Sequence, residues 1–155
     1  MIVLVECYSD TALIRALGVQ RQNLRHEFCK GNVMNGLRKA TSDATGLIDA
    51  DPDNQNPPAE LSNYRQTENA HGLRLLIHAQ QPRKKVIEVS PRLEEWLVER
   101  AGACDLGLAQ YGLPQTAREM KRIPRYDKKP GFERFLADLL KKDDGMKAMK
   151  RWLRA

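Results

Sequence analysis

The chain has 155 residues, of which 41% are hydrophobic and 30% are charged, and this predicts a single soluble globular domain. No apolar run approaches the ~20 residues that span a membrane, and the apolar run 1–5 is too short for a signal peptide. Cys7, Cys29 and Cys104 form neither a disulfide framework nor a zinc motif, so we expect a reducing cytoplasm.

The net charge of +6 is unevenly distributed along the chain. Residues 1–117 contain 13 Lys and Arg against 14 Asp and Glu, whereas residues 118–155 contain 13 against 6. A basic segment on an otherwise balanced domain favours a polyanionic partner, most simply nucleic acid. A solvated, lysine-rich terminal helix is the alternative interpretation.

The first half of the chain alternates strand and helix patterns. Short apolar runs predict strands over 2–6, 26–29 and 46–49, and helical spacing predicts helices over 12–17 and 33–40. Ser9 or Asp10 is the expected N-cap of the first helix. This alternation implies parallel strands joined by crossover helices.

The segment 52–71 is polar and rich in Asn and Pro, so we expect a long loop that includes at most a short helix over 59–67. Beyond it, strands are predicted over 73–78 and 86–89, and helices over 93–101, 115–125, 131–142 and 146–153. The predicted fold is an α/β domain with a mainly parallel, four- to five-stranded sheet flanked by helices. Its core would span residues 1–105, with a basic helical extension over 106–155 packed on the same domain.

Three acidic residues follow the third predicted strand at alternate positions, namely Asp49, Asp51 and Asp53. Carboxylate oxygens are preferred ligands of Mg²⁺, and crowded carboxylates repel one another unless a cation joins them. The carboxyl edge of a parallel sheet is also where ligands usually bind. An ordinary acidic turn is the alternative. An EF-hand calcium loop is disfavoured because Asn54 stands where that loop needs glycine.

Glu6 closes the first predicted strand, directly after five apolar residues. If the first and third strands are neighbours in the sheet, Glu6 lies close to Asp49 and Asp51. An acid at each of two strand ends is a stronger indication of a metal site than one acid alone, because the fold brings the two ends together.

The order of these features resembles that of Toprim domains, the metal-binding catalytic modules of topoisomerases, bacterial primases, OLD-family nucleases and recombination mediators. Val-Glu-Cys-Tyr-Ser-Asp at 5–10 resembles their Val-Glu-Gly-x-x-Asp opening, and Asp-Ala-Asp at 49–51 resembles their Asp-x-Asp motif. His-Glu-Phe-Cys-Lys-Gly at 26–31 is similar to the family's second strand. Ile-Glu-Val-Ser-Pro-Arg-Leu-Glu-Glu-Trp-Leu at 87–97 is similar to a strand and helix of small stand-alone members. The resemblance covers about residues 1–100 and departs from the family at Cys7, where glycine would let a phosphate approach closely.

The resemblance implies a divalent-metal-dependent nuclease that hydrolyses phosphodiester bonds in DNA or RNA, in repair or in anti-phage defence. Glu6 would be the general acid or base, and Asp49 and Asp51 would complete the catalytic set. Glu6, Asp49 and Asp51 would hold Mg²⁺ or Mn²⁺, with Asp53 and Glu94 as further ligands. Glu94 is alternatively an acid favoured by the dipole at a helix start.

The candidate phosphate-binding residues are basic side chains near the second strand and in the C-terminal segment: Lys30, Lys121, Arg122, Arg125, Lys128 and Lys129. Lys30 is alternatively a solvent-facing lysine. The rival function is a non-catalytic Toprim-fold module that binds nucleic acid or a partner protein, and Cys7 favours it. A phosphotransfer enzyme is disfavoured because no Walker-type loop is present. The sequence leaves open whether the chain works beside a partner such as an ATPase.

Overall fold

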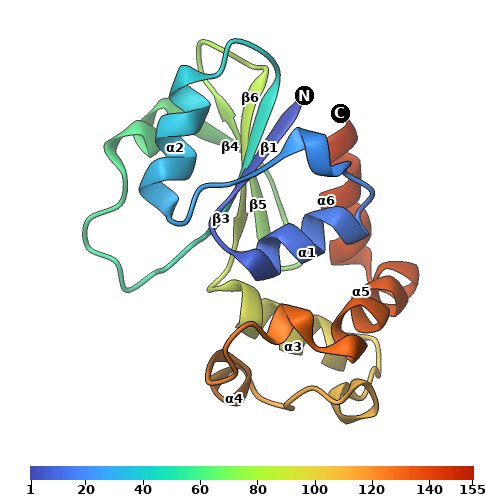
Figure 1. Cartoon of the computed structure of the whole chain (residues 1–155). Helices are drawn as coiled ribbons and strands as arrows, with labels where there is room; N and C mark the ends of the chain where they lie inside the picture. Colours follow the sequence, from blue (N-terminus) through green and yellow to red (C-terminus); the bar gives the residue numbers. More distant parts are fainter.

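The computed structural model describes all residues from 1 to 155, and Figure 1 shows its sheet edge-on between helices. Six strands form one mixed sheet in the order β2-β1-β3-β6-β5-β4. The strands β2, β1, β3 and β6 run parallel, whereas β5 and β4 are antiparallel to their neighbours. The strand bounds are β1 (Ile2–Val5), β2 (Leu24–His26), β3 (Ala44–Asp49), β4 (Tyr64–Ala70), β5 (Leu73–His78) and β6 (Lys84–Val89).

The α/β class is therefore confirmed, whereas the expected four or five strands are wrong because β4 adds a sixth. The sequence carries no strand pattern over β4, since the side chains of 65–69 are all exposed. β4 is an edge strand that pairs only with β5, and edge strands are commonly polar or charged. The predicted short helix over 59–67 is reduced to a 3-10 turn, η2 (Ala59–Asn63), that leads into β4.

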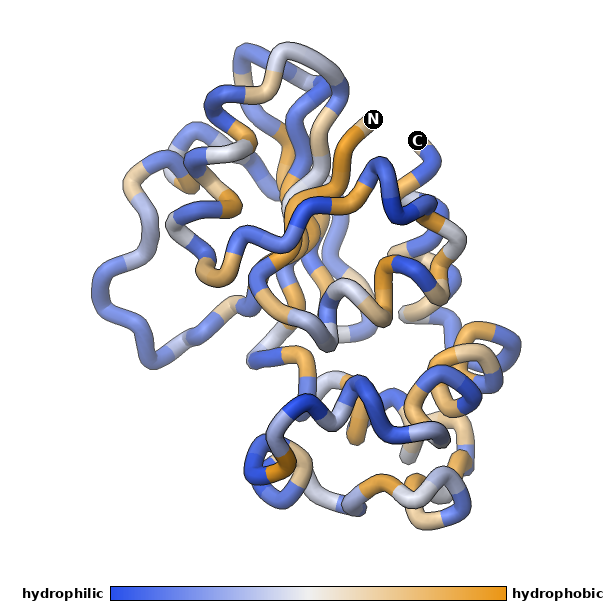
Figure 2. Tube along the Cα trace, viewed as in Figure 1, coloured by the Kyte–Doolittle hydropathy of each residue, from blue (hydrophilic) through white to orange (hydrophobic).

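The sheet separates two hydrophobic clusters. Alternate side chains of β1 face opposite sides, so Val3 and Val5 join a cluster of 29 buried residues and Leu4 joins one of 9. The helices α1 (Tyr8–Ala16) and α6 (Asp144–Arg154) cover the larger cluster, and α2 (Lys30–Lys39) covers the smaller one. Figure 2 shows the apolar strands at the centre and polar loops around them.

The remaining helices form a lobe beneath the carboxyl ends of the parallel strands (Figure 1). Trp96 and Trp152, from either side of residue 105, share the larger cluster. The predicted helix over 115–125 is confined to five residues, and Pro124 disfavours helical geometry at the residue before it. Every helix of the chain is too short or too polar to traverse a bilayer. The lobe consists of α3 (Leu93–Ala103), η3 (Leu108–Tyr111), α4 (Ala117–Lys121), η4 (Tyr126–Lys128) and α5 (Pro130–Lys142).

Two helix starts differ from the sequence prediction. The N-cap of α1 is Cys7, not Ser9 or Asp10: Cys7 Sγ accepts from the Asp10 amide at 3.4 Å, and Asp10 Oδ2 accepts from the Cys7 amide at 3.0 Å. The strand predicted over 26–29 is also displaced: β2 ends at His26, and Lys30 and Gly31 open α2. Gly46 of β3 lets α2 approach the sheet, because a Cβ there would lie 2.8 Å from Val33.

Candidate functional site

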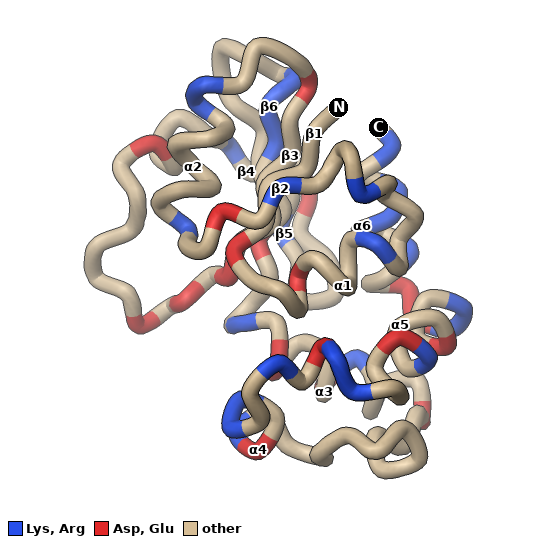
Figure 3. The backbone as a smooth tube through the Cα atoms, viewed as in Figure 1, with Lys and Arg blue, Asp and Glu red and all other residues tan.

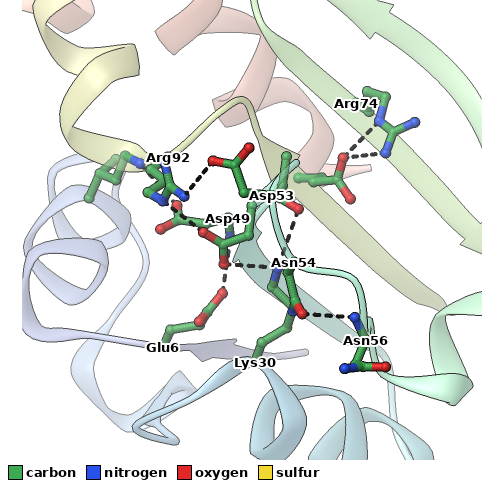
Figure 4. A network of polar contacts seen from close by, with 12 residues as sticks. Glu6, Lys30, Asp49, Asp53, Asn54, Asn56, Arg74 and Arg92 are labelled. Carbon is green, nitrogen blue, oxygen red and sulfur yellow. Dashed lines mark hydrogen bonds and ion pairs between the residues drawn. The ribbon is translucent and has the colours of Figure 1, made fainter.

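The ends of β1 and β3 bring Glu6 and Asp49 together. These strands are parallel neighbours with Val5 opposite Leu47, so the residues after them lie at the same edge of the sheet. Glu6 Oε1 accepts a hydrogen bond from the Asp49 backbone amide at 2.9 Å (Figure 4). The expected proximity of Glu6 and Asp49 is confirmed.

Asp49 also connects the sheet to the helical lobe. Its Oδ1 accepts from the backbone amide of Leu93, the first residue of α3, at 2.9 Å. Burial, together with the nearby charges of Asp10, Glu6 and Glu94, raises the pKa of the Asp49 carboxyl to about 8. A carboxyl in this environment holds a proton at neutral pH unless a cation replaces it.

Asp10 and Glu6 share this crowding. Burial, aided by the charges of Glu6 and Glu94 and opposed by the hydrogen bonds with Cys7, raises the pKa of Asp10 to about 7. Burial also raises the pKa of Glu6, although the Asp49 amide partly offsets it. Asp10 is thus not the N-cap residue of α1 but its partner in the cap, as the acceptor of the Cys7 amide, and the same side chain belongs to the acidic cluster. Figure 3 shows acidic segments gathered where the sheet meets the lobe.

Asp51 lies beside the cluster and is neutralised by two cations. Lys30 Nζ lies 3.1 Å from Asp51 Oδ2, and Arg92 Nε lies 2.8 Å from Asp51 Oδ1. The Lys30 side chain is only 10% exposed and also donates to the Ala50 carbonyl at 3.4 Å, so the solvent-facing alternative for Lys30 is wrong. Asp51 has a left-handed backbone, φ 46°, which turns the chain sharply after β3.

Arg92 is the site residue that sequence reasoning missed. It is the N-cap residue of α3, and only Ser90 and Pro91 separate it from the end of β6, the other parallel neighbour of β3. Its position after a third parallel strand was the available signal. Arg92 Nη2 also lies 3.5 Å from Asp53, whose side chain is 87% exposed. Its exposure places Asp53 at the outer rim of the site, and Figure 4 shows its carboxylate directed toward Arg92.

Glu94 is held by the C-terminal segment. The Tyr126 hydroxyl of η4 donates to Glu94 Oε1 at 3.0 Å, and burial followed by the Glu94 charge raises the pKa of that phenol. Glu94 is close enough to Asp49 and Asp10 to raise the pKa of both. The C-terminal segment thus forms one wall of the site.

The basic residues predicted to bind phosphate differ in how free they are. Lys121 is paired with Glu95, and Arg125 donates two hydrogen bonds, of 2.9 and 2.8 Å, to Asp127. Lys121 and Arg125 line a surface pocket together with Glu94 and Cys7. Arg122 and Lys128 are exposed on the same segment, and Lys129 is the N-cap residue of α5.

Cys7 is unsuited to act as a nucleophile. Burial raises the pKa of its thiol, the charge of Asp10 raises it further, and the sulfur is engaged as the cap of α1. Among the histidines, His78 has a structural role, because its Nδ1 accepts from the backbone amides of Gln80 and Gln81.

The donor set fits a hard divalent cation by its chemistry. Glu6, Asp49 and Asp10 present carboxylate oxygens whose pKa values are raised, and a bound cation would relieve their repulsion. As arranged, however, no three Asp, Glu, His or Cys side chains converge closely enough to hold an ion. The fold brings the ligands to one edge without gathering them around one point.

Comparison with protein-family models, with curated proteins and with solved structures finds no match to this chain. What the fold and the site define is a class: an α/β protein with a mostly parallel sheet, carrying a buried acidic cluster and two cationic side chains at the carboxyl edge of that sheet.

Proposed function

We propose that this chain is a Toprim-type nuclease that hydrolyses phosphodiester bonds of DNA or RNA with the help of Mg²⁺ or Mn²⁺. The observation that carries the proposal is the junction of Glu6 and Asp49 at adjacent parallel strand ends, with a 2.9 Å hydrogen bond between them. The order of a first-strand Glu and a third-strand Asp-x-Asp supports the same family.

Glu6 is the proton carrier in this proposal. The Asp49 amide orients Glu6 through Oε1, and burial raises the pKa of the carboxyl toward the range in which it can both take and release a proton. Glu6 would take a proton from the attacking water or give one to the leaving oxygen. This is a task that an ordinary exposed glutamate performs poorly near neutral pH.

Glu6, Asp49 and Asp51 are the ligands we propose for the cation, with Asp53 and Glu94 as outer acids. When bound, the ion would stabilise the charge on the phosphate and lower the pKa of a water. Lys30 and Arg92 lie at the same edge and are suited to hold phosphate oxygens. Arg92 offers a planar fork of donors, which matches two phosphate oxygens at once.

The test is a nuclease assay on plasmid, single-stranded DNA and RNA, with Mg²⁺, with Mn²⁺ and with EDTA. Asp49→Asn and Glu6→Gln are expected to lower the rate by about 10²–10⁴-fold, the usual contribution of a positioned acid or base. Asp144→Asn, an exposed acid of α6 that pairs with Lys147, is the matched control and should cut at the wild-type rate. Identical traces for wild type and Asp49→Asn would end the proposal.

The second candidate is a non-catalytic Toprim-fold module that binds nucleic acid or a partner protein. The observation in its favour is that Asp51 is already neutralised by Lys30 and Arg92. Calorimetric Mn²⁺ binding that Asp49→Asn abolishes, together with no cleavage of any substrate, would select this function.

A further inference from the structure

Two of the three large hydrophobic side chains exposed on this protein lie together beside the site. Phe28 is 72% exposed and Tyr8 is 43% exposed, and the ring of His26 lies between them. The centroids of Tyr8 and His26 are 4.3 Å apart, and those of His26 and Phe28 are 4.1 Å apart with planes tilted by 31°. We call these three residues the aromatic ladder.

The fold does not account for a phenylalanine at position 28. Phe28 belongs to neither hydrophobic cluster, and its backbone is left-handed with φ 70°. Residues other than glycine rarely adopt this conformation, and a bulky side chain in it is a genuine outlier. Such strain gathers at binding sites, where the surrounding structure holds the residue in place. The outer face of the ring is therefore available for a ligand.

The aromatic ladder is joined directly to the acidic cluster. His26 Nε2 hydrogen bonds the backbone carbonyl of Glu6 at 3.0 Å. Phe28 stands two residues before Lys30, whose ammonium group is 3.1 Å from Asp51. A ligand that covers Phe28 consequently lies next to the edge where Glu6 and Asp49 meet.

The charge around the aromatic ladder is suited to a phosphate chain. The Arg125 guanidinium, which also pairs with Asp127, lies 3.6 Å from the centroid of the Tyr8 ring, at the far end of the ladder from Phe28. Arg122 and Lys128 are exposed on the same segment. The side chain of Cys29 makes no capping hydrogen bond to α2, and the Lys30 amide at the start of this helix serves the Glu6 carboxylate. Exposed rings flanked by cations are the combination by which proteins hold single-stranded nucleic acid.

We propose that an unpaired nucleobase stacks on the outer face of Phe28 and extends the aromatic ladder, so that the site takes single-stranded DNA or RNA. The bases of an intact duplex are already stacked on both faces and cannot reach the ring without being turned out. This inference rests on the proposed function in that it assigns nucleic acid to the site, but it concerns binding and requires no cleavage.

Binding measured in EDTA, where cleavage is absent, tests the inference separately from the nuclease. Fluorescence anisotropy would compare labelled single strands of DNA and RNA with a duplex of the same sequence. Phe28→Asn removes the ring and suits the left-handed backbone. It should weaken single-strand binding by about 5- to 150-fold, the effect of losing one base–aromatic stack. Phe28→Trp should retain wild-type affinity.

The tryptophan introduced by Phe28→Trp provides a second, direct readout, because the native Trp96 and Trp152 are buried. Its fluorescence should be quenched by a single strand and not by a strand whose nucleotides are all abasic. Arg154→Ala, in a pocket beside Met1 at the opposite sheet edge, is the control and should change affinity by less than about twofold.

The inference is overturned if Phe28→Asn binds single strands as wild type does, if the duplex binds equally well, or if no nucleic acid binds. Phe28-dependent binding by a protein that never cuts would uphold the aromatic ladder and reject the nuclease. If Phe28→Asn cuts nucleic acid and binds it as wild type does, the nuclease is upheld and the aromatic ladder is rejected.

Discussion

Replacing Asp49 by asparagine preserves an oxygen for the Leu93 amide but removes a buried carboxyl that sits among other acids. Because burial and the neighbouring acids raise the pKa of Asp49 from 3.8 to about 8, the folded protein binds this proton more tightly than the unfolded chain does. The stability that the proton provides is fully present below pH 3.8 and is lost as the pH rises toward 8. The side-chain amide of the Asp49→Asn variant has no such proton to lose.

The size of the effect follows from the distance between the two pKa values. Each pH unit within that window lowers the free energy of unfolding of wild type by about 1.4 kcal/mol. Near pH 7 this free energy is therefore lower than at acidic pH by up to about 4 kcal/mol. Asp49→Asn should therefore be more stable than wild type at pH 7 by about 2–4 kcal/mol. For a chain of this length this raises Tm by about 5–15 °C. The same substitution should abolish nuclease activity.

The assay is thermal unfolding by circular dichroism in EDTA at several pH values between about 4 and 8. The gain should be near zero at the acidic end and grow steadily toward the alkaline end, whereas Asp144→Asn should follow wild type throughout. A variant that melts below wild type at pH 7, or a gain that is independent of pH, would refute the reasoning about the acidic cluster.

Two further substitutions test the packing that supports the site, each with a control nearby. Asp143 is fully buried, accepts from Arg100 at 2.7 Å and accepts from the Met146 amide at 2.8 Å. Asp143→Ala should therefore lower the free energy of unfolding, measured in urea, by about 3–5 kcal/mol. The control Asp144→Ala, at an exposed position, should lower it by less than about 0.5 kcal/mol. An equal effect of both would contradict the buried pair. At Gly131 an added methyl group would collide with the Tyr111 carbonyl, so Gly131→Ala should lower the free energy of unfolding by about 1–3 kcal/mol. Gly102 lies within α3 with open space around it, so the control Gly102→Ala should raise the free energy of unfolding by up to about 1 kcal/mol. If both variants are more stable than wild type, α5 does not pack against Tyr111 as described.

The site residues that could be predicted from the sequence are those that stand at the ends of strands. Glu6 and Asp49 each follow an apolar run, and parallel neighbours bring such ends together whatever the loops do. Arg92 was missed because an arginine before a helix has no distinctive pattern, and its role depends on β6 being the third parallel strand at that edge. The aromatic ladder was missed because Tyr8, His26 and Phe28 come from different elements and meet only in three dimensions.

The sequence predicted that the basic C-terminal segment forms one phosphate-binding surface, but the fold places its basic residues in different parts of the molecule. Arg154 lines a pocket with Met1 at the opposite edge of the sheet, and Lys121 and Arg125 are occupied by Glu95 and Asp127. The cations at the site's edge of the sheet are instead Lys30 and Arg92, which come from the part of the chain with no net positive charge and share Asp51 as partner. In the proposed nuclease, a divalent cation taken up by Asp51 would leave both of them free for phosphate oxygens. Metal and substrate binding would then reinforce each other through a single carboxylate.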